Sequence, residues 1–218
     1  RDNYDKNMAM LPSIVSGVKI TRIELWVTNK RSSYESPRNI IAFTDLGESE
    51  HISNAIWSST GGPATDNSAN DLYRRIANDY PQARDIDNVA TTLGGFLMGS
   101  TDYEKISNAR KLSESEYTLN SSLGYISLRN ALSSDEVLAV AFEYTYAGQS
   151  YQVGEFSSDI TDSGNALYVK LLKSNSNVPG SGTWDLMMKN IYSLGSGSVS
   201  SNKFKLNIYY ASDSTGSY

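Results

Sequence analysis

One ten-residue segment, VLAVAFEYTY from Val137 to Tyr146, constrains the fold more than any other part of the chain. Side chains of a strand point alternately to opposite sides, so the two faces of this segment can be read separately. One face holds Val137, Ala139 and Ala141, which are small but apolar. The other face holds Leu138, Val140, Phe142, Tyr144 and Tyr146. A strand that is apolar on both faces is typical of a central strand under cover, so we expect a β-sheet with further layers packed on it.

Several other segments show the same two-residue period and are separated by turn residues. They are 18–28, 38–44, 117–119, 125–128, 151–156, 166–173 and 203–210. The first of these changes phase near Thr21 and Arg22, which predicts either a β-bulge or burial on both faces there. The turn from Asn120 to Gly124 lies between two short strand segments and predicts a hairpin.

Helical signals are fewer and shorter. Helices are predicted over residues 71–79, 102–111 and 184–194. The first has Leu72 and Ile76 on one face. The second begins at Thr101 with the spacing of a capping box. The third has apolar residues at i, i+3, i+4 and i+7 and is ended by Gly195.

The order of these elements predicts the fold class. Strands come first, short helices follow, and hairpin-forming strands dominate the rest. We therefore expect a mostly β protein with β-sandwich-like antiparallel sheets and a few short helices. Two lobes are one option for this fold, an N-terminal lobe over residues 1–99 and a C-terminal lobe over residues 100–218.

Periodicity also predicts which side chains are buried. Trp26, Phe142, Trp184 and Phe204 each belong to an apolar periodic set, and we expect them in cores. Lys205 lies on the opposite face of its segment and is expected to be exposed.

Composition excludes several classes of protein. The chain is 39% hydrophobic and 20% charged, which is ordinary for a folded protein and unlike a disordered tail. Its net charge of −5 argues against sequence-independent binding of nucleic acid. There is no cysteine, which excludes a disulfide scaffold and is compatible with an exported bacterial protein.

No apolar run approaches the roughly 20 residues of a membrane helix. The chain starts abruptly at Arg1, and we interpret it as a piece of a longer protein.

Candidate catalytic residues are few. A Ser-His-Asp triad needs the single histidine, His51, which lies in a Ser/Asn-rich loop without a G-x-S-x-G elbow. A solvated loop histidine is the alternative that we favour. Paired carboxylates could hydrolyse glycosides. The candidates Glu24, Glu143 and Glu155 are expected on outward faces or at strand ends, as solvated carboxylates. We therefore predict no catalytic residue and no enzyme activity.

Candidate binding sites are also weak. Asp159, Asp162 and Asn165 share one loop with Gly164 and could bind calcium, but their spacing is not that of an EF-hand and an ordinary Asx turn is favoured. The glycines at 94–95 and 195–197 lack the context of a phosphate loop. We predict no metal and no cofactor. Exposed tyrosines could form a platform for glycans, although cross-strand packing accounts for most of the 15 tyrosines.

Four longer segments resemble one known family. They are ITRIELWVTN (20–29) with RNIIAFTDLGE (38–48); YEKISNARKLSESEYTLNSSLGYISL (103–128); DEVLAVAFEYTYAGQSYQVGEFS (135–157); and ALYVKLLKS (166–174) with WDLMMKNIYSLG (184–195) and FKLNIYYASDSTGSY (204–218). In these segments the chain is similar to the giant outer-membrane proteins SprA and Sov, which form the translocon of the type IX secretion system in Bacteroidetes and are tied to gliding motility.

The resemblance implies a role and a location. It implies a soluble, N-terminal-type module beside a very large barrel, in the cell envelope and associated with the outer membrane. The implied partners are the rest of its own barrel protein, other secretion components and secreted cargo, with no nucleic acid among them. The family offers no catalytic residue to carry over. Asp213-Ser214-Thr215 resembles the short O-glycosylation motif of these bacteria. A surface glycan-binding or adhesion module is the alternative function.

Overall fold

The computed structural model describes residues 1–218 except 12, 31–34, 63, 177, 189–199, 201, 208 and 210–218. The chain divides into two compact units, Arg1–Met187 and Met188–Tyr218. Every helix and strand assigned to the described residues lies in the first unit. No helix in the described part of the chain is long and apolar enough to cross a bilayer.

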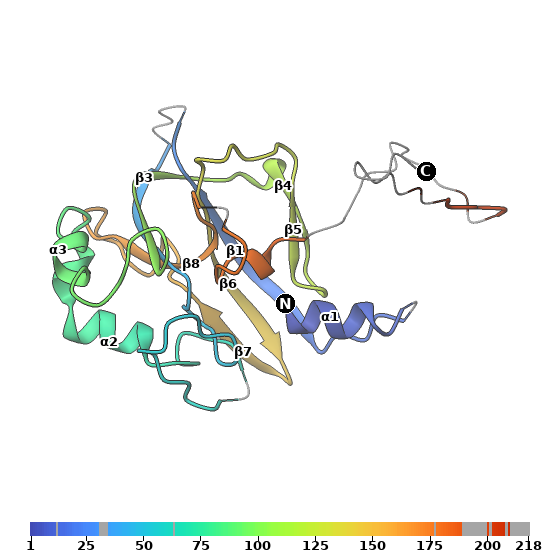
Figure 1. Cartoon of the computed structure of the whole chain (residues 1–218), viewed down its shortest axis with the longest axis horizontal. Helices are drawn as coiled ribbons and strands as arrows, with labels where there is room; N and C mark the ends of the chain where they lie inside the picture. Colours follow the sequence, from blue (N-terminus) through green and yellow to red (C-terminus); the bar gives the residue numbers. More distant parts are fainter. Residues whose placement is uncertain are drawn as a thin grey trace, which may run out of the picture. The chain divides into compact units, whose positions relative to one another are not determined.

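Eight strands and three short α-helices form the first unit, together with three 3₁₀ turns (Figure 1). The strands are β1 (Val18–Val27), β2 (Arg38–Phe43), β3 (Tyr103–Lys111), β4 (Tyr117–Asn120), β5 (Tyr125–Leu128), β6 (Leu138–Tyr146), β7 (Gln149–Val153) and β8 (Leu167–Lys173). The α-helices are α1 (Asp2–Met8), α2 (Leu72–Asp79) and α3 (Val89–Leu93). The 3₁₀ turns are η1 (Pro81–Arg84), η2 (Glu114–Glu116) and η3 (Trp184–Leu186).

Six of the strands form one sheet that closes on itself. Their order is β1-β3-β2-β8-β6-β7, and β1 also pairs with β6, so five strands complete a ring to which β7 is added. The pairing of β2 with β8 is parallel, whereas the other pairings in this sheet are antiparallel. The predicted fold class, mostly β with antiparallel sheets and a few short helices, is confirmed. The opposing layers of the predicted sandwich are supplied largely by opposite walls of this small barrel.

Small side chains allow the ring to close. One core cluster receives residues from all five strands of the ring and therefore lies inside it. Ala42, Ala109, Ala139 and Ala141 are fully buried in this cluster, beside the indole of Trp26. A narrow barrel has room for few large side chains, so alanine at these positions matches the space available.

Two further layers cover the outside of the barrel. Helices α2 and α3 pack on the outer face of β2, β3 and β8, with Leu72 and Ile76 buried as the sequence predicts (Figure 1). The β4–β5 hairpin contributes to a third cluster, which includes Leu25 of β1 and Val140 of β6. Strand β6 is thus covered on both faces, as its double apolar pattern predicts.

Two local predictions about strands are confirmed. The pairing of β1 with β6 shifts register between Ile20 and Arg22, where the apolar phase changes. The hairpin forms with Tyr117 opposite Leu128 and Asn120 opposite Tyr125.

The helix predicted over residues 102–111 is wrong, because this segment is strand β3. Ile106 and Ala109 are three residues apart yet both point into the barrel, because the pairing with β2 shifts register here and Asn108 takes a φ of 52°. The bulge therefore produces a spacing that imitates a helix. Glu104, the supposed capping residue, accepts a hydrogen bond from Ser174 Oγ at 2.7 Å.

The C-terminal predictions differ from the structure as well. The helix expected over residues 184–194 is only the turn η3, because Met187 takes an extended backbone conformation; residues 189–194 lie outside the described part. No strand is assigned to 203–207. Phe204, expected in a core, is 52% exposed, whereas Lys205 is exposed as expected. Trp26 is buried, and Phe142 and Trp184 are half-buried.

The sheet is built from both halves of the sequence. Strands β1 and β2 come from residues 1–99, while β3, β6, β7 and β8 come from residues 100–218. The structure therefore shows one packed unit over Arg1–Met187 in place of two lobes divided after residue 99. The two halves form one unit because β1 pairs with β6, and no local sequence pattern predicts a pairing between segments so far apart. Asp213-Ser214-Thr215 and the glycines at 195–197 lie outside the described residues.

Candidate functional site

The pairing between β1 and β3 covers only one end of β1. Two backbone hydrogen bonds reach the same edge of β1 from the segment that follows β3. Leu112 N donates to Leu25 O at 2.8 Å, and Ile20 N donates to Ser121 O at 2.9 Å. Between these two points, from Thr21 to Glu24, no described strand is paired with this edge, because β3 pairs only with residues 26 and 27.

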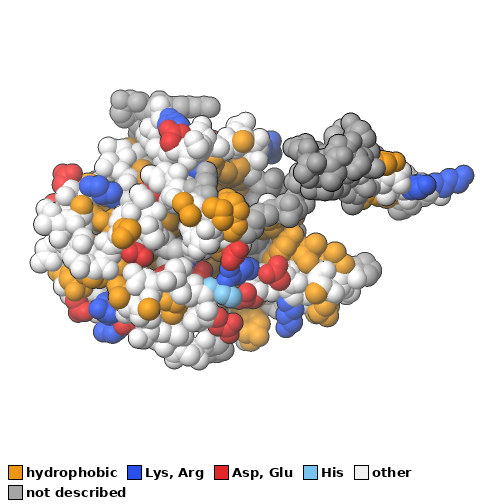
Figure 2. All heavy atoms as spheres, viewed as in Figure 1, with side chains coloured by type: hydrophobic (Ala, Val, Ile, Leu, Met, Phe, Trp, Pro, Cys, Tyr) orange, Lys and Arg blue, Asp and Glu red, His pale blue; other side chains and the backbone are white. Residues whose placement is uncertain are grey.

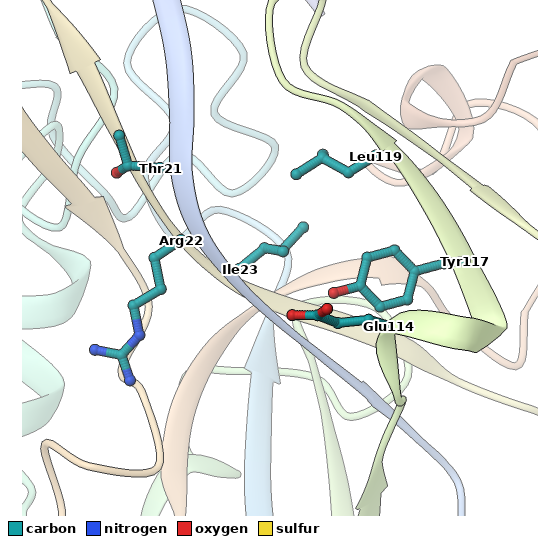
Figure 3. A pocket seen from close by; sticks show the side chains of 6 residues that line it. All are labelled: Thr21, Arg22, Ile23, Glu114, Tyr117 and Leu119. Carbon is teal, nitrogen blue, oxygen red and sulfur yellow. The ribbon is translucent and has the colours of Figure 1, made fainter.

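A cavity of about 400 Å³ lies beside this open edge, between β1 and β4 (Figure 3). We call it the β1–β4 groove; it is lined by Thr21, Arg22, Ile23, Glu114, Tyr117 and Leu119. The Ile23 side chain points from β1 toward Tyr117, which lies across the groove (Figure 3). Ile23, Tyr117 and Leu119 are each half-buried, so the groove has an apolar wall that is only partly covered. Burial, followed by the nearby Glu114 carboxylate, raises the pKa of the Tyr117 phenol.

A capping box positions the groove's far wall. The backbone N–H of Ser113 donates to Glu116 Oε2 at 2.9 Å, which fixes η2 and the start of β4. The Arg110 guanidinium donates to both Glu116 oxygens, at 2.9 and 2.8 Å. This hydrogen bond is the main reason that the pKa of Glu116 is lowered to about 2. Glu114 and Tyr117 therefore project from a well-fixed turn.

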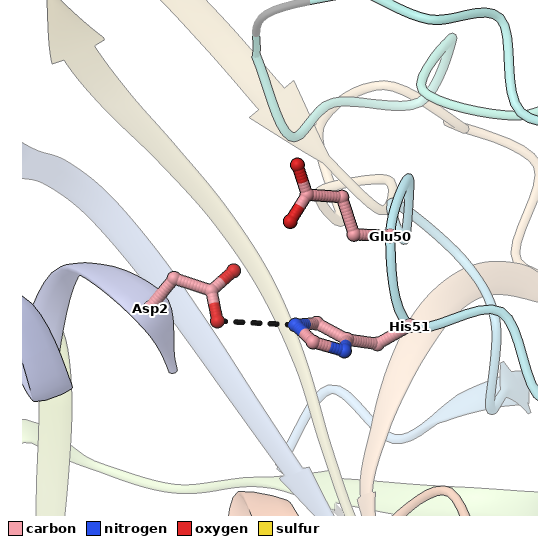
Figure 4. A group of neighbouring side chains, drawn as sticks. All are labelled: Asp2, Glu50 and His51. Atoms are coloured by element: carbon pink, nitrogen blue, oxygen red, sulfur yellow. Dashed lines mark hydrogen bonds and ion pairs between the residues drawn. The ribbon is translucent and has the colours of Figure 1, made fainter.

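The single histidine belongs to an exposed group on another part of the surface. His51 Nε2 lies 3.1 Å from Asp2 Oδ1, and Glu50 is their neighbour (Figure 4). Figure 2 shows the histidine at the surface with acidic side chains beside it. One ligand atom from each of the three residues lies within 4.8 Å of the others, and an imidazole with two carboxylates is a donor set that suits zinc or manganese. All three residues are exposed, and Asp2 also lies 3.8 Å from Arg1 Nε, a cation that competes for the same carboxylate.

Two of the three candidate carboxylates are not solvated, which corrects the prediction. Glu155 is 2% exposed and binds the guanidinium of Arg84 through both oxygens, each at 2.5 Å. It also accepts hydrogen bonds from Tyr73 Oη and Tyr168 N, both at 2.8 Å. Burial, followed by this carboxylate, raises the pKa of Tyr73 well above its ordinary value. Glu155 thus ties β8, α2 and η1 together.

Glu24 is the second buried carboxylate. It lies on the face of β1 that turns into the barrel, where it accepts hydrogen bonds from Ser157 N at 2.8 Å and Ser157 Oγ at 2.9 Å. Lys111 Nζ is 3.4 Å away. Glu143, by contrast, is half-buried and accepts from Thr21 Oγ1 at 2.9 Å. Each of the three carboxylates is therefore engaged by donors from the chain itself.

The candidate calcium loop is held by internal contacts. Asp162 Oδ1 accepts from Gly164 N at 2.9 Å, which is the favoured Asx turn, and Asp162 Oδ2 accepts from Asn165 Nδ2 at 3.1 Å. Asp159 Oδ2 accepts from Phe156 N at 2.9 Å. The guanidinium of buried Arg38 donates to main-chain carbonyls of this loop, including that of Ile160 at 2.8 Å. A cation at these carbonyls would have to displace Arg38.

The tyrosines divide into packed and accessible groups. Tyr103, Tyr144 and Tyr168 are buried, and cross-strand packing accounts for Tyr151, whose ring stacks on Tyr144 with centroids 5.3 Å apart. A polar cavity of about 310 Å³ lies beside Tyr151 and is lined by Asp66, Asn67, Ser68, Ser150, Tyr151 and Gln152. Among the described tyrosines, Tyr146 and Tyr209 are the most exposed, at 44% and 80%.

Sequence reasoning missed the β1–β4 groove, because the open edge is a property of pairing between distant segments. The phase change at Thr21 was the one local signal near it. Comparison with known proteins does not name the groove's ligand: no protein-family model matches this chain, and no curated protein matches it.

Proposed function

We propose that this chain is a non-catalytic module of an outer-membrane translocon of the type IX secretion system, in a protein of the SprA and Sov type. Its role is to shape the vestibule of the pore or to dock partner components. Two observations support this proposal. Four segments, which together span most of residues 18–218, resemble that family, and the β1–β4 groove combines an open strand edge with partly covered apolar side chains.

The groove carries the binding part of the proposal. A strand edge with unpaired backbone groups is a template for another chain, and protein folds usually protect such edges. Here the edge from Thr21 to Glu24 is accompanied by an apolar wall, which gives a partner both hydrogen bonds and apolar surface. A stable complex would bury roughly 1,200–2,000 Å² in total, so a partner would extend beyond the groove itself.

The carboxylates support a binding role over a catalytic one. Glu24 and Glu155 each satisfy their oxygens with internal donors, and Arg84 neutralises Glu155 directly. A general acid or base must reach a proton of the substrate. The oxygens of these two carboxylates are instead buried and bound by donors of the chain itself. The proposed partners are the rest of the barrel protein, other secretion components and secreted cargo, at the outer membrane of the cell envelope.

A glycan-binding or adhesion module is the second candidate. The polar cavity beside Tyr151 favours it, because an aromatic face with neighbouring amide, hydroxyl and carboxylate groups is suited to sugars. A glycan array with the purified chain separates the two proposals. Specific glycan binding that is lost in Tyr151→Ala would favour adhesion.

Export by the parent protein tests the translocon proposal. Residues 18–212 are deleted, and cargo with a sorting domain is measured in the medium, normalised to the barrel present in the membrane. We expect the barrel to assemble and cargo release to fall at least tenfold. His51→Ala is the matched control and should export normally. Normal export by the deletion would contradict the proposal, and loss of export in His51→Ala alone would reopen an enzymatic role.

A further inference from the structure

We propose that the edge of β1 between Thr21 and Glu24 binds an extended segment of a partner protein as an added β-strand. The segment is apolar at alternate positions and carries a basic side chain that faces Glu114. This inference rests on the proposed function as a docking module, and it adds the chemistry of the partner and the site that receives it.

The backbone of β1 requires an extended partner. Leu25 O faces away from β6, because it accepts from Leu112 N. Backbone groups alternate in direction along an antiparallel strand, so the N–H and C=O of Ile23 face the same way as those of Leu25. No described strand pairs with this side of Ile23. Four edge residues span about 13 Å, which is the length of a short strand. An extended backbone laid along this edge would bring an acceptor and a donor to the N–H and C=O of Ile23.

The side chains of the groove select apolar residues at alternate positions. Ile23 on β1 and Tyr117 and Leu119 on β4 are half-buried around the cavity (Figure 3). Burying apolar surface contributes about 25 cal/mol for each Å² removed from water. Side chains of an added strand point alternately to its two faces, so every second residue of the partner would lie against this wall.

The charge at the groove selects a basic residue. Glu114 projects beside Tyr117, and none of the ion pairs found among the described residues involves it. Arg22, the one basic residue of the lining, is turned toward the Phe156 ring, with its guanidinium carbon 3.8 Å from the ring centroid, and toward Glu24 at 3.5 Å. A Lys or Arg of the partner would therefore meet an available carboxylate.

A synthetic peptide tests the proposal with the full-length chain. The probe is NKFKLNIYYA, the sequence of residues 202–211, which alternates apolar side chains with two lysines. Binding of the labelled probe is measured by fluorescence anisotropy. The control peptide has the same composition with the alternation removed (FLIYYKKNNA). We expect the probe to bind at least tenfold more tightly than the control and to slow hydrogen exchange of the Ile23 amide.

Variants of the groove locate the binding. Leu119→Asp places a charge on the apolar wall and should weaken binding at least tenfold. Thr118→Asp is its matched control, because the neighbouring Thr118 is exposed on the opposite face of β4. Glu114→Lys should also weaken binding of the probe NKFKLNIYYA, because its lysines would then meet a positive charge. Thermal melting of each variant shows that a loss of binding does not reflect unfolding.

Three outcomes would overturn the inference. They are equal binding of both peptides, equal loss in Leu119→Asp and Thr118→Asp, and no change in Ile23 exchange. A fourth outcome would overturn a partner protein as the occupant. If the probe binds only to the variant Phe204→Ser/Leu206→Ser, the chain's own segment occupies the edge. None of these outcomes depends on export. Loss of peptide binding would therefore overturn this site and leave the docking module standing, whereas normal export by the deletion of residues 18–212 would contradict the docking module itself.

Discussion

Glu155 illustrates how single residues hold this protein together. Its carboxylate is buried and paired with Arg84, so removing one partner leaves a charge without compensation. We expect Arg84→Ala to lower the free energy of unfolding by about 3–5 kcal/mol. In the double variant Arg84→Met/Glu155→Gln both charges are absent while the amide oxygen can still accept from Tyr168 N, so most of that loss should be recovered. Urea denaturation of the single and double variants measures this coupling, and equal losses in both would contradict it.

Glu116 provides a pH-dependent contribution at the same scale. The hydrogen bond from Arg110 lowers its pKa from 4.5 to about 2 in the folded protein. A lowered carboxyl pKa stabilises the fold above pH 4.5, and the contribution is lost as the pH falls toward 2. Glu116→Gln should therefore cost about 1 kcal/mol at pH 7, because the pair is partly exposed. Its difference from the unmodified chain should vanish between pH 4.5 and 2. A stability difference that stays constant over this pH range would contradict the prediction.

At the scale of elements, the interior of the barrel depends on small residues. Ala141 of β6 is fully buried, and a Cβ on Gly154 would lie only 3.2 Å from the Ala141 Cβ. A larger side chain has no space there, so we expect Ala141→Leu to lower the free energy of unfolding by about 1–3 kcal/mol. Ala131→Leu, on an exposed loop, should change it by less than about 0.5 kcal/mol. Chemical denaturation measures both, and similar values for the two variants would mean that the interior has spare room.

The loop from Ser157 to Asn165 is the second element with a testable property. Arg38 donates to its carbonyls, and its aspartates accept internal hydrogen bonds. We expect millimolar calcium to leave the melting temperature unchanged. A ligand that binds only the folded state at 100 times its dissociation constant would add about 2.7 kcal/mol. A clear rise in melting temperature that a chelator reverses would contradict this prediction. In Arg38→Ala the guanidinium that competes for the loop carbonyls is removed. A rise in melting temperature with calcium in this variant alone would show that Arg38 keeps the cation out.

For the molecule as a whole, closure of the ring makes the two halves of the sequence depend on each other. Strand β1 pairs with β6 along its whole length, and β2 lies between β3 and β8. We therefore expect residues 1–99 and residues 100–187, expressed separately, to be unfolded, and the chain 1–187 to fold. Circular dichroism and thermal melting of these three polypeptides test this. A cooperative transition in either half alone would restore the division into two lobes.

The sequence by itself determined the local character of most elements. Alternating apolar residues predicted β1, β2, β6, β8 and the β4–β5 hairpin, and helical spacing predicted α2. These predictions succeeded because the strands and α2 bury one or two faces, and burial imposes a period on the sequence. The phase change at Thr21 predicted either a bulge or burial on both faces, and the register of β1 with β6 shifts at this point.

Tertiary structure decided what no local period encodes. Residues 103–111 form a strand because pairing with β2 stabilises the extended backbone more than a capping box would stabilise a helix. The bulge at Asn108 shifts the two-residue period, so the apolar residues of this strand have the spacing of a helix. Glu24 and Glu155 are buried because Ser157 and Arg84, distant in sequence, supply their partners. The open edge of β1 exists because β3 leaves it after two paired residues. Closure of the ring, the buried charges and the groove all depend on contacts between distant segments, and such contacts form only when the chain folds as a whole.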